Sequence, residues 1–126
     1  REHLASNIGL TRQRTAAKQA RKRLSKARSL ASPDKSLQFH AELGTTVVSY
    51  IADKLNISPH GLTNDQIIEL LSQKSVDPAL TSELLAILRQ CDFARFGSAS
   101  VSTDAMAAAL RAAETVMTRL EEVNLA

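Results

Sequence analysis

The chain is poor in the residues that build sheets and tight turns. Among 126 residues there are four aromatic side chains, Phe39, Tyr50, Phe93 and Phe96, no tryptophan, four glycines and three prolines. Strands favour aromatic and β-branched residues and are joined by frequent turns, so this scarcity argues against an all-β fold. Alanine, leucine and serine are abundant instead, and we expect an all-α protein with a core of aliphatic side chains.

A single cysteine, Cys91, leaves the chain without an intramolecular disulfide. The fold therefore does not depend on an oxidising compartment, which favours the cytoplasmic side. Long apolar runs are also missing: no stretch approaches the roughly 20 residues that span a bilayer, and the N-terminus lacks the apolar run of a signal peptide. We expect a soluble piece, and because it begins with Arg1 we expect it to be processed or cut from a longer chain.

The small net charge of +3 conceals two oppositely charged regions. Residues 1–30 hold nine lysines and arginines against one glutamate, a net of +8, whereas residues 31–126 hold seven against twelve acidic residues, a net of −5. The length suits one domain with a modest core. We therefore expect a basic helical arm over residues 1–31, of the kind found beside membranes, followed by a helical bundle domain over residues 32–126.

We expect a bundle of about five helices, the first of them formed by the basic arm. This helix is predicted from about Leu10 to Ala31, and Gly9 weakens any extension toward Arg1. Its apolar stripe is thin, because alanine buries little area. The stripe recurs at steps of three and four and consists of Ala17, Ala20, Leu24, Ala27 and Ala31.

The second helix, predicted from Pro33 to about Leu55 with Ser32 as its cap, has the strongest pattern in the chain. At 100° per residue one half of it is apolar, with Leu37, Phe39, Leu43, Val47, Val48, Tyr50, Ile51 and Leu55. The other half is expected to be exposed and carries Gln38, Glu42, Thr45, Thr46, Ser49 and Asp53. Gly44 falls in the apolar arc, where a missing side chain lets another helix approach closely.

Two shorter helices are expected to follow. Thr63 and Gln66 have the spacing of a capping box and begin a helix that ends near Lys74. Asp77 and Pro78 begin the next helix, whose buried stripe is Leu80, Leu84, Ile87, Leu88 and Cys91. We expect this helix to end or distort at residues 91–95, so that Phe93 and Phe96 pack in the turn before Gly97.

A closing helix completes the predicted bundle. Ser102 or Thr103 caps it, and apolar residues recur at steps of four and three. Such a short heptad-like seam packs onto the bundle rather than forming a separate coiled coil. The seam consists of Met106, Leu110, Ala113, Met117 and Leu120.

The residues predict no catalytic or metal site. Cys91 and His40 are the one nucleophile and base to consider, but both fall on apolar helix faces, where a buried structural role is the ordinary one. His60, between Pro59 and Gly61, is expected in an exposed loop. The sequence has no Cys pair, His-x-x-x-His spacing, calcium-type acidic loop or glycine-rich phosphate loop. We therefore expect no enzymatic activity, no cofactor and no small-molecule substrate.

The basic residues of the leading helix are the candidate contact site: Arg12, Arg14, Lys18, Arg21, Lys22, Arg23, Lys26 and Arg28. Three interpretations are open. Such charges bind nucleic acid through counterion release, although no aromatic residue precedes Phe39 and the cations point all round the helix. They also attract anionic lipid at the cytoplasmic face, at about 1 kcal/mol per basic residue. The third interpretation is a solvated helix without a partner.

Five short stretches gain weight from their order and spacing: Arg21–Ala27, Phe39–Leu43, Tyr50–Ile57, Leu62–Thr63 and Cys91–Phe96. Together they resemble the cytoplasmic C-terminal region of the BatD family, membrane proteins of bacterial aerotolerance operons. The resemblance spans roughly residues 10–122, and the run from Cys91 to Phe96 weighs most.

The resemblance implies extracytoplasmic β-sandwich-like domains, a single transmembrane helix, and this helical region as a tail on the cytoplasmic side of the bacterial inner membrane. The family has no established enzymatic activity, and its operon companions include von Willebrand factor A-type membrane proteins and a MoxR-type ATPase. We expect a non-catalytic interaction domain that assembles with such proteins in aerotolerance and oxidative stress, with the basic arm at the anionic membrane. The alternative is a nucleic-acid-binding helical domain that uses the basic helix.

Overall fold

The computed structural model describes residues 2–96, 101–123 and 125, with side chains from Thr11 onward. Five α-helices and one short 3-10 helix follow one another: α1 (Glu2–Ser29), η1 (Pro33–Lys35), α2 (Ser36–Leu55), α3 (Asn64–Gln73), α4 (Pro78–Phe96) and α5 (Thr103–Glu121). No strand occurs in these described ranges, and the predicted all-α bundle of about five helices is confirmed. None of the helices described is long and apolar enough to cross a bilayer.

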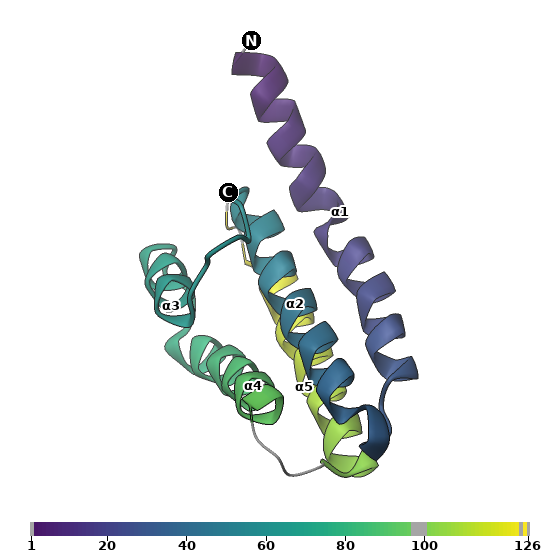
Figure 1. Cartoon of the computed structure of the whole chain (residues 1–126). Coiled ribbons are helices and arrows are strands. Elements are labelled where there is room, and N and C mark those ends of the chain that lie inside the picture. The colour runs from purple at the N-terminus through teal and green to yellow at the C-terminus, as the bar shows by residue number, and fades with distance from the viewer. Residues whose placement is uncertain (1, 97–100, 124, 126) are drawn as a thin grey trace.

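Three long helices form the centre of the molecule (Figure 1). α2 and α5 run beside each other in one direction, and α1 runs against both of them, with its first turns extending past the end of α2. α3 and α4 lie on the other side of α2, where α4 packs on both α2 and α5. α2 is therefore the central helix, with neighbours on opposite sides.

α1 joins the core through a stripe of small residues. Ala16, Ala20, Leu24 and Ala27 are all buried, and alanines at these positions let α1 approach α2 closely. The predicted stripe named Ala17 rather than Ala16; Ala17 instead lies at the edge of the contact, on the side of α5. α1 also begins at Glu2, because one Gly9 costs about 1 kcal/mol in a helix and does not end it. The expected arm and bundle thus share one core.

The faces of α2 differ from the two halves expected. Phe39, Leu43, Val47, Tyr50 and Ile51 are buried as predicted. Thr46 was placed on the exposed half but is fully buried, because that side of α2 faces α1. Leu37 was placed in the core but is 57% exposed, since it lies at the edge of the buried arc in the first turn.

Gly44 lies where α2 packs closely against α4, as its place in the apolar arc predicted. A Cβ atom on Gly44 would lie 3.4 Å from the Cβ atom of Cys91. Any side chain larger than a methyl group would therefore meet α4. Cys91 itself is buried, in agreement with the expected structural role.

The predicted helix starts are confirmed where a side chain caps the helix. The backbone N–H of Gln66 donates to the Thr63 hydroxyl (3.1 Å) and the Gln66 side chain accepts from the N–H of Thr63 (2.9 Å), which completes the capping box. Asp77 accepts from the N–H of Ala79 (2.9 Å), and Ser102 accepts from the N–H of Ala105 (3.1 Å).

The start of the second helix differs in detail from its prediction. Ser32 precedes Pro33 as expected, but its side chain makes no capping hydrogen bond. The chain first forms the 3-10 turn η1, and the regular helix α2 begins only at Ser36.

The end of α4 contradicts the sequence prediction. The helix continues without distortion to Phe96, because Cys91 and Ala94 extend its buried stripe by another turn. Phe93 and Phe96 then fall on the opposite side and are 78% and 84% exposed. They do not pack in a turn, and the turn expected at Gly97 lies outside the residues described. In α5 the predicted seam is confirmed, with all five of its residues buried.

Candidate functional site

The eight predicted contact residues all lie on α1, but the structure divides them into two groups. Arg12, Lys26 and Arg28 form ion pairs with residues of the bundle. The other five have no ion-pair or hydrogen-bond partner among the side chains described: Arg14, Lys18, Arg21, Lys22 and Arg23. Three of the eight cations thus pair with acidic residues within the molecule, and the other five remain available to a partner.

Arg12 holds the C-terminal end of α2. Its Nη2 atom lies 3.0 Å from Oδ1 of Asp53 and donates to the carbonyl of Ile57 (2.9 Å), while its Nη1 atom donates to Oδ1 of Asn56 (2.9 Å). Asn56 ends the helix in the left-handed conformation, with φ of 55°. Helix C-termini leave carbonyls without partners and favour a positive charge, so Arg12 acts as a cap supplied by another helix.

Lys26 and Arg28 fix the other end of α1. Nζ of Lys26 lies 3.8 Å from the Glu42 carboxylate on α2, and Nη2 of Arg28 lies 2.5 Å from the Glu114 carboxylate on α5. Both pairs are partly exposed, so each contributes less than about 1 kcal/mol to stability. Their effect is on position: together with Arg12 they hold α1 in register with α2 and α5.

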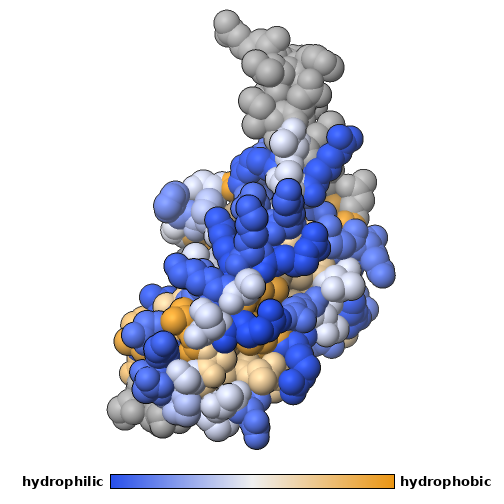
Figure 2. Space-filling model, turned by 90° about the vertical axis from the view of Figure 1, so that its right-hand side faces the viewer, coloured by the Kyte–Doolittle hydropathy of each residue, from blue (hydrophilic) through white to orange (hydrophobic). Residues whose placement is uncertain are grey.

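Three of the five unpaired cations form a row on α1, which we call the outward row. Arg14, Lys18 and Lys22 are spaced four residues apart, which places them on one face of the helix, and all three are exposed. Figure 2 views the molecule from this side and shows hydrophilic side chains covering α1. The cations were expected to point all round the helix; instead none of them enters the stripe of buried alanines that contacts the bundle.

A second exposed surface lies at the end of α4 and was not predicted. We define the aromatic cluster as Phe93, Arg95 and Phe96; the guanidinium carbon of Arg95 lies 5.8 Å from the centre of the Phe96 ring. Half of the four aromatic residues in the chain are therefore exposed on one helix end. Extending the stripe from Leu84 through Cys91 at helical spacing would have placed Phe93 on the outer side.

The buried titratable residues are enclosed in the core. His40 is fully buried, and its Nδ1 atom lies 2.8 Å from the carbonyl oxygen of Ser36 and 3.4 Å from the Ser36 hydroxyl. Burial raises the pKa of the Cys91 thiol to about 12, with the nearby Asp92 adding to the effect, so Cys91 is protonated at neutral pH. None of the hollows described is lined by Ser36, His40 or Cys91. His60 is exposed in its loop, as predicted.

Tyr50 joins the ends of α2 and α5. Its hydroxyl donates to the carbonyl of Met117 (3.1 Å) and to the carboxylate of Glu121. Nζ of Lys54 lies 3.2 Å from the same carboxylate, and the Lys54 side chain is only 12% exposed. Burial raises the pKa of Tyr50, and the hydrogen bond to Glu121 adds to this effect. The Oε2 atom of Glu121 thus has two partners at the end of α2, although the Glu121 side chain is 37% exposed.

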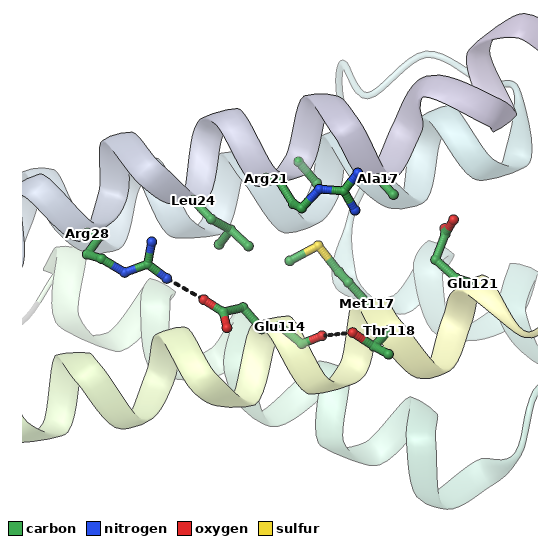
Figure 3. Close-up of a pocket in the computed structure, with 9 residues that line it drawn as sticks. Ala17, Arg21, Leu24, Arg28, Glu114, Met117, Thr118 and Glu121 are labelled. Carbon is green, nitrogen blue, oxygen red and sulfur yellow. Dashed lines mark hydrogen bonds and ion pairs between the residues drawn. The ribbon is translucent and has the colours of Figure 1, made fainter.

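Three hollows among the residues described are large enough to hold a ligand or a partner's side chain. The first, of about 330 Å³, lies between α1 and α5 (Figure 3), and Leu24, Arg21 and Met117 point into it. The second, of about 450 Å³, lies between α3 and the loop at residues 60–62. The third, of about 650 Å³, lies between α2, the loop at residues 59–63 and the end of α4. Its rim is polar, and Asn64 donates there to the Asp92 carboxylate (3.2 Å).

Neither a metal site nor a known relative indicates a function for this chain. Within residues 2–96, 101–123 and 125, no three His, Cys, Asp or Glu side chains are grouped so that they could hold a metal ion. Comparison of the chain with family models, with curated proteins and with solved structures finds no match. The resemblance to BatD therefore stays a prediction from the sequence.

Proposed function

We propose that this chain is a non-catalytic helical interaction domain of a membrane-anchored bacterial protein, and that it assembles with partner proteins on the cytoplasmic side of the membrane. The observation that carries the proposal is the aromatic cluster at the end of α4. Phe93 and Phe96 are three residues apart on the side of α4 that faces away from the core.

The composition of this cluster suits a protein interface. Aromatic residues and arginine are enriched where binding energy concentrates, and charged residues such as lysine and glutamate are depleted there. Covering a phenylalanine side chain contributes about 1.5–3 kcal/mol, which here is available only to a partner. Neither ring packs into the core described, so selection for folding alone does not account for two phenylalanines in a chain with so few aromatic residues.

The outward row of α1 supports a position next to an anionic membrane. Arg14, Lys18 and Lys22 extend from one helix face, and flexible cations of this kind gain about 1 kcal/mol each near an anionic lipid surface. The resemblance to BatD supplies the class of partner, von Willebrand factor A-type membrane proteins of the same operon, and the connection with aerotolerance and oxidative stress.

Nucleic-acid binding by the basic helix is the second candidate, and the row of unpaired cations is the observation that favours it. It has less support, because single-strand binding uses aromatic side chains for stacking and α1 carries none. Adenine edges in a duplex are read by asparagine or glutamine, and the outward row contains neither.

The test uses the whole parent protein in its own membranes. A tagged protein carrying Phe93→Ala and Phe96→Ala is purified in mild detergent and compared with the unchanged protein for recovery of the von Willebrand factor A-type companions. Leu37→Ala is the matched control, because Leu37 is also an exposed apolar residue but lies on α2. We expect loss of the companions only with the α4 variant. Equal recovery from all three proteins would contradict the proposed role.

A further inference from the structure

The groove between α1 and α5 has an apolar floor and charged edges. Leu24 and Ala20 from α1 and Met117 from α5 form the floor, and Figure 3 shows Leu24 and Met117 pointing toward each other across it. The ion pair of Arg28 with Glu114 closes one end. Arg21 extends from α1 over the middle of the groove and is exposed.

The charges around this groove are unequally satisfied. The Glu114 carboxylate is paired with Arg28, and the Glu121 carboxylate is held by Tyr50 and Lys54. Arg21, in contrast, has no partner among the described side chains. The groove therefore presents apolar surface beside one uncompensated positive charge, and this combination selects for an apolar group next to an anion.

Its size and lining restrict the occupant further. A volume of about 330 Å³ lies at the lower end of the range for ligand pockets, so it holds one or two side chains rather than a whole helix. Met117 is flexible and adapts to groups of different shape, as methionines do at binding surfaces. Ala17, Thr118 and Glu121 complete the lining, and Thr118 is exposed.

We propose that this groove binds an acidic, hydrophobic peptide segment of a partner protein: an apolar side chain enters between Leu24 and Met117, and a neighbouring carboxylate pairs with Arg21. Bidentate pairing with a carboxylate is the geometry that a guanidinium favours. A peptide is favoured over a lipid surface because the apolar floor of Ala20, Leu24 and Met117 is recessed between α1 and α5, and because Arg21 is the one unpaired cation of α1, among the residues described, that lines this groove. The site is separate from the aromatic cluster, so either interaction can fail without the other.

Fluorescence anisotropy with a labelled synthetic peptide tests this proposal directly. The probe carries leucines at helical spacing with glutamates beside them, and a second probe has glutamine in place of every glutamate. We expect the first probe to bind at moderate salt and the second to bind at least ten times more weakly. Equal binding of the two probes would show that no carboxylate pairs with Arg21, and would contradict the proposal.

Two pairs of variants locate the binding. Arg21→Glu is expected to weaken binding of the acidic probe at least ten-fold, whereas Lys22→Glu, which makes the same change of charge on the outward row, weakens it less than two-fold. Thr118→Trp fills the groove from an exposed position without changing charge and is expected to abolish binding. Its control is Thr115→Trp, an exposed position on α5 outside the groove.

The same titrations with phosphatidylglycerol vesicles distinguish a lipid from a peptide. If the chain binds vesicles through Arg21 and Thr118 but does not bind the acidic probe, the groove belongs to lipid and the proposal is wrong. Equal loss of probe binding in Arg21→Glu and Lys22→Glu would likewise overturn it, since general attraction between opposite charges would then account for the affinity. Circular dichroism confirms in each case that the variant remains helical.

Discussion

Arg12 and Asp53 lie 3.0 Å apart although 41 residues separate them in the chain, and they connect α1 to the last turn of α2. Because the same guanidinium also donates to Asn56 and Ile57, one side chain completes the end of the central helix. This contact joins the first helix to the bundle.

Replacing Arg12 by alanine should therefore destabilise the fold. The change removes a partly exposed ion pair and two further hydrogen bonds from a charged donor, and we expect the free energy of unfolding to fall by about 1–2 kcal/mol. Urea denaturation measures the effect. Arg14→Ala is the control: this exposed residue has no partner among those described, so its change should stay within about 0.5 kcal/mol. Equal losses in the two variants would mean that Arg12 does not cap α2.

At Gly44 the size of a substituted side chain determines whether the fold becomes more or less stable. An added methyl group would lie in ordinary contact with Cys91, at 3.4 Å from its Cβ atom, while alanine stabilises a helix interior relative to glycine. Gly44→Ala is expected to raise the free energy of unfolding by about 0.5–1 kcal/mol. Gly44→Leu forces α2 and α4 apart and is expected to lower it by about 1–3 kcal/mol. Thermal unfolding of the two variants measures both effects, and a stabilising leucine would contradict the close approach of these helices.

Cys91 should be protected from thiol reagents in the folded protein. It is 2% exposed, and its pKa of about 12 leaves almost no thiolate at pH 8. We expect labelling by a maleimide to be slow in buffer and fast in denaturant. Rapid labelling of the native protein would contradict the buried position.

The raised pKa of Cys91 also predicts how stability changes with pH. An acid whose pKa is higher in the folded state than in the unfolded state, where it is 9.0, stabilises the fold fully below the lower value. That contribution disappears as the pH rises from about 9 to about 12. The free energy of unfolding of Cys91→Ala should therefore fall less between pH 8 and pH 10 than that of the unchanged chain. Urea titrations at the two pH values measure the difference.

Local sequence patterns predicted much of this fold for a physical reason. Capping residues act within three or four positions, so Thr63 with Gln66 and Ser102 marked their helices correctly. Helical periodicity likewise identified the buried seam of α5 from Met106 to Leu120. These features depend on neighbours in the chain, and a single sequence contains that information.

The parts that the sequence did not predict depend on contacts between distant residues. The burial of Thr46 follows from the docking of α1 on a polar side of α2, and the pair of Arg28 with Glu114 joins residues 86 positions apart. The eight cations were identified as a group from composition, but which of them are paired depends on that docking. The exposure of Phe93 was not predicted for another reason. A phenylalanine was expected to be buried, although helical periodicity places Phe93 off the buried stripe of α4.

The exposure of the α4 aromatic cluster makes a prediction about stability that separates binding from folding. Phe93→Ala with Phe96→Ala removes two large side chains, yet both are more than three-quarters exposed, so the free energy of unfolding should change by less than about 1 kcal/mol. Phe39→Ala, in the fully buried core, should cost about 3–5 kcal/mol. Guanidinium denaturation compares them. A large loss of stability in the Phe93→Ala, Phe96→Ala variant would mean that these rings pack within the fold. Unfolding, rather than a lost interface, would then explain why the companion proteins are not recovered.

The outward row of α1 predicts a dependence on lipid charge. Lys18→Glu with Lys22→Glu reverses two unpaired cations on one exposed face, so binding to phosphatidylglycerol vesicles should weaken by at least about 2 kcal/mol at low salt, as vesicle sedimentation measures. Lys74→Glu, an exposed cation at the end of α3, is the control and should have a smaller effect.

Titration of the unchanged chain with duplex DNA tests the second candidate function, nucleic-acid binding. Contacts to several phosphates require the affinity for DNA to fall steeply with salt. Anionic lipid and DNA would contact the same cations, so their relative affinities distinguish the two candidates. Tight, steeply salt-dependent binding to DNA together with no binding to anionic vesicles would assign the outward row to nucleic acid.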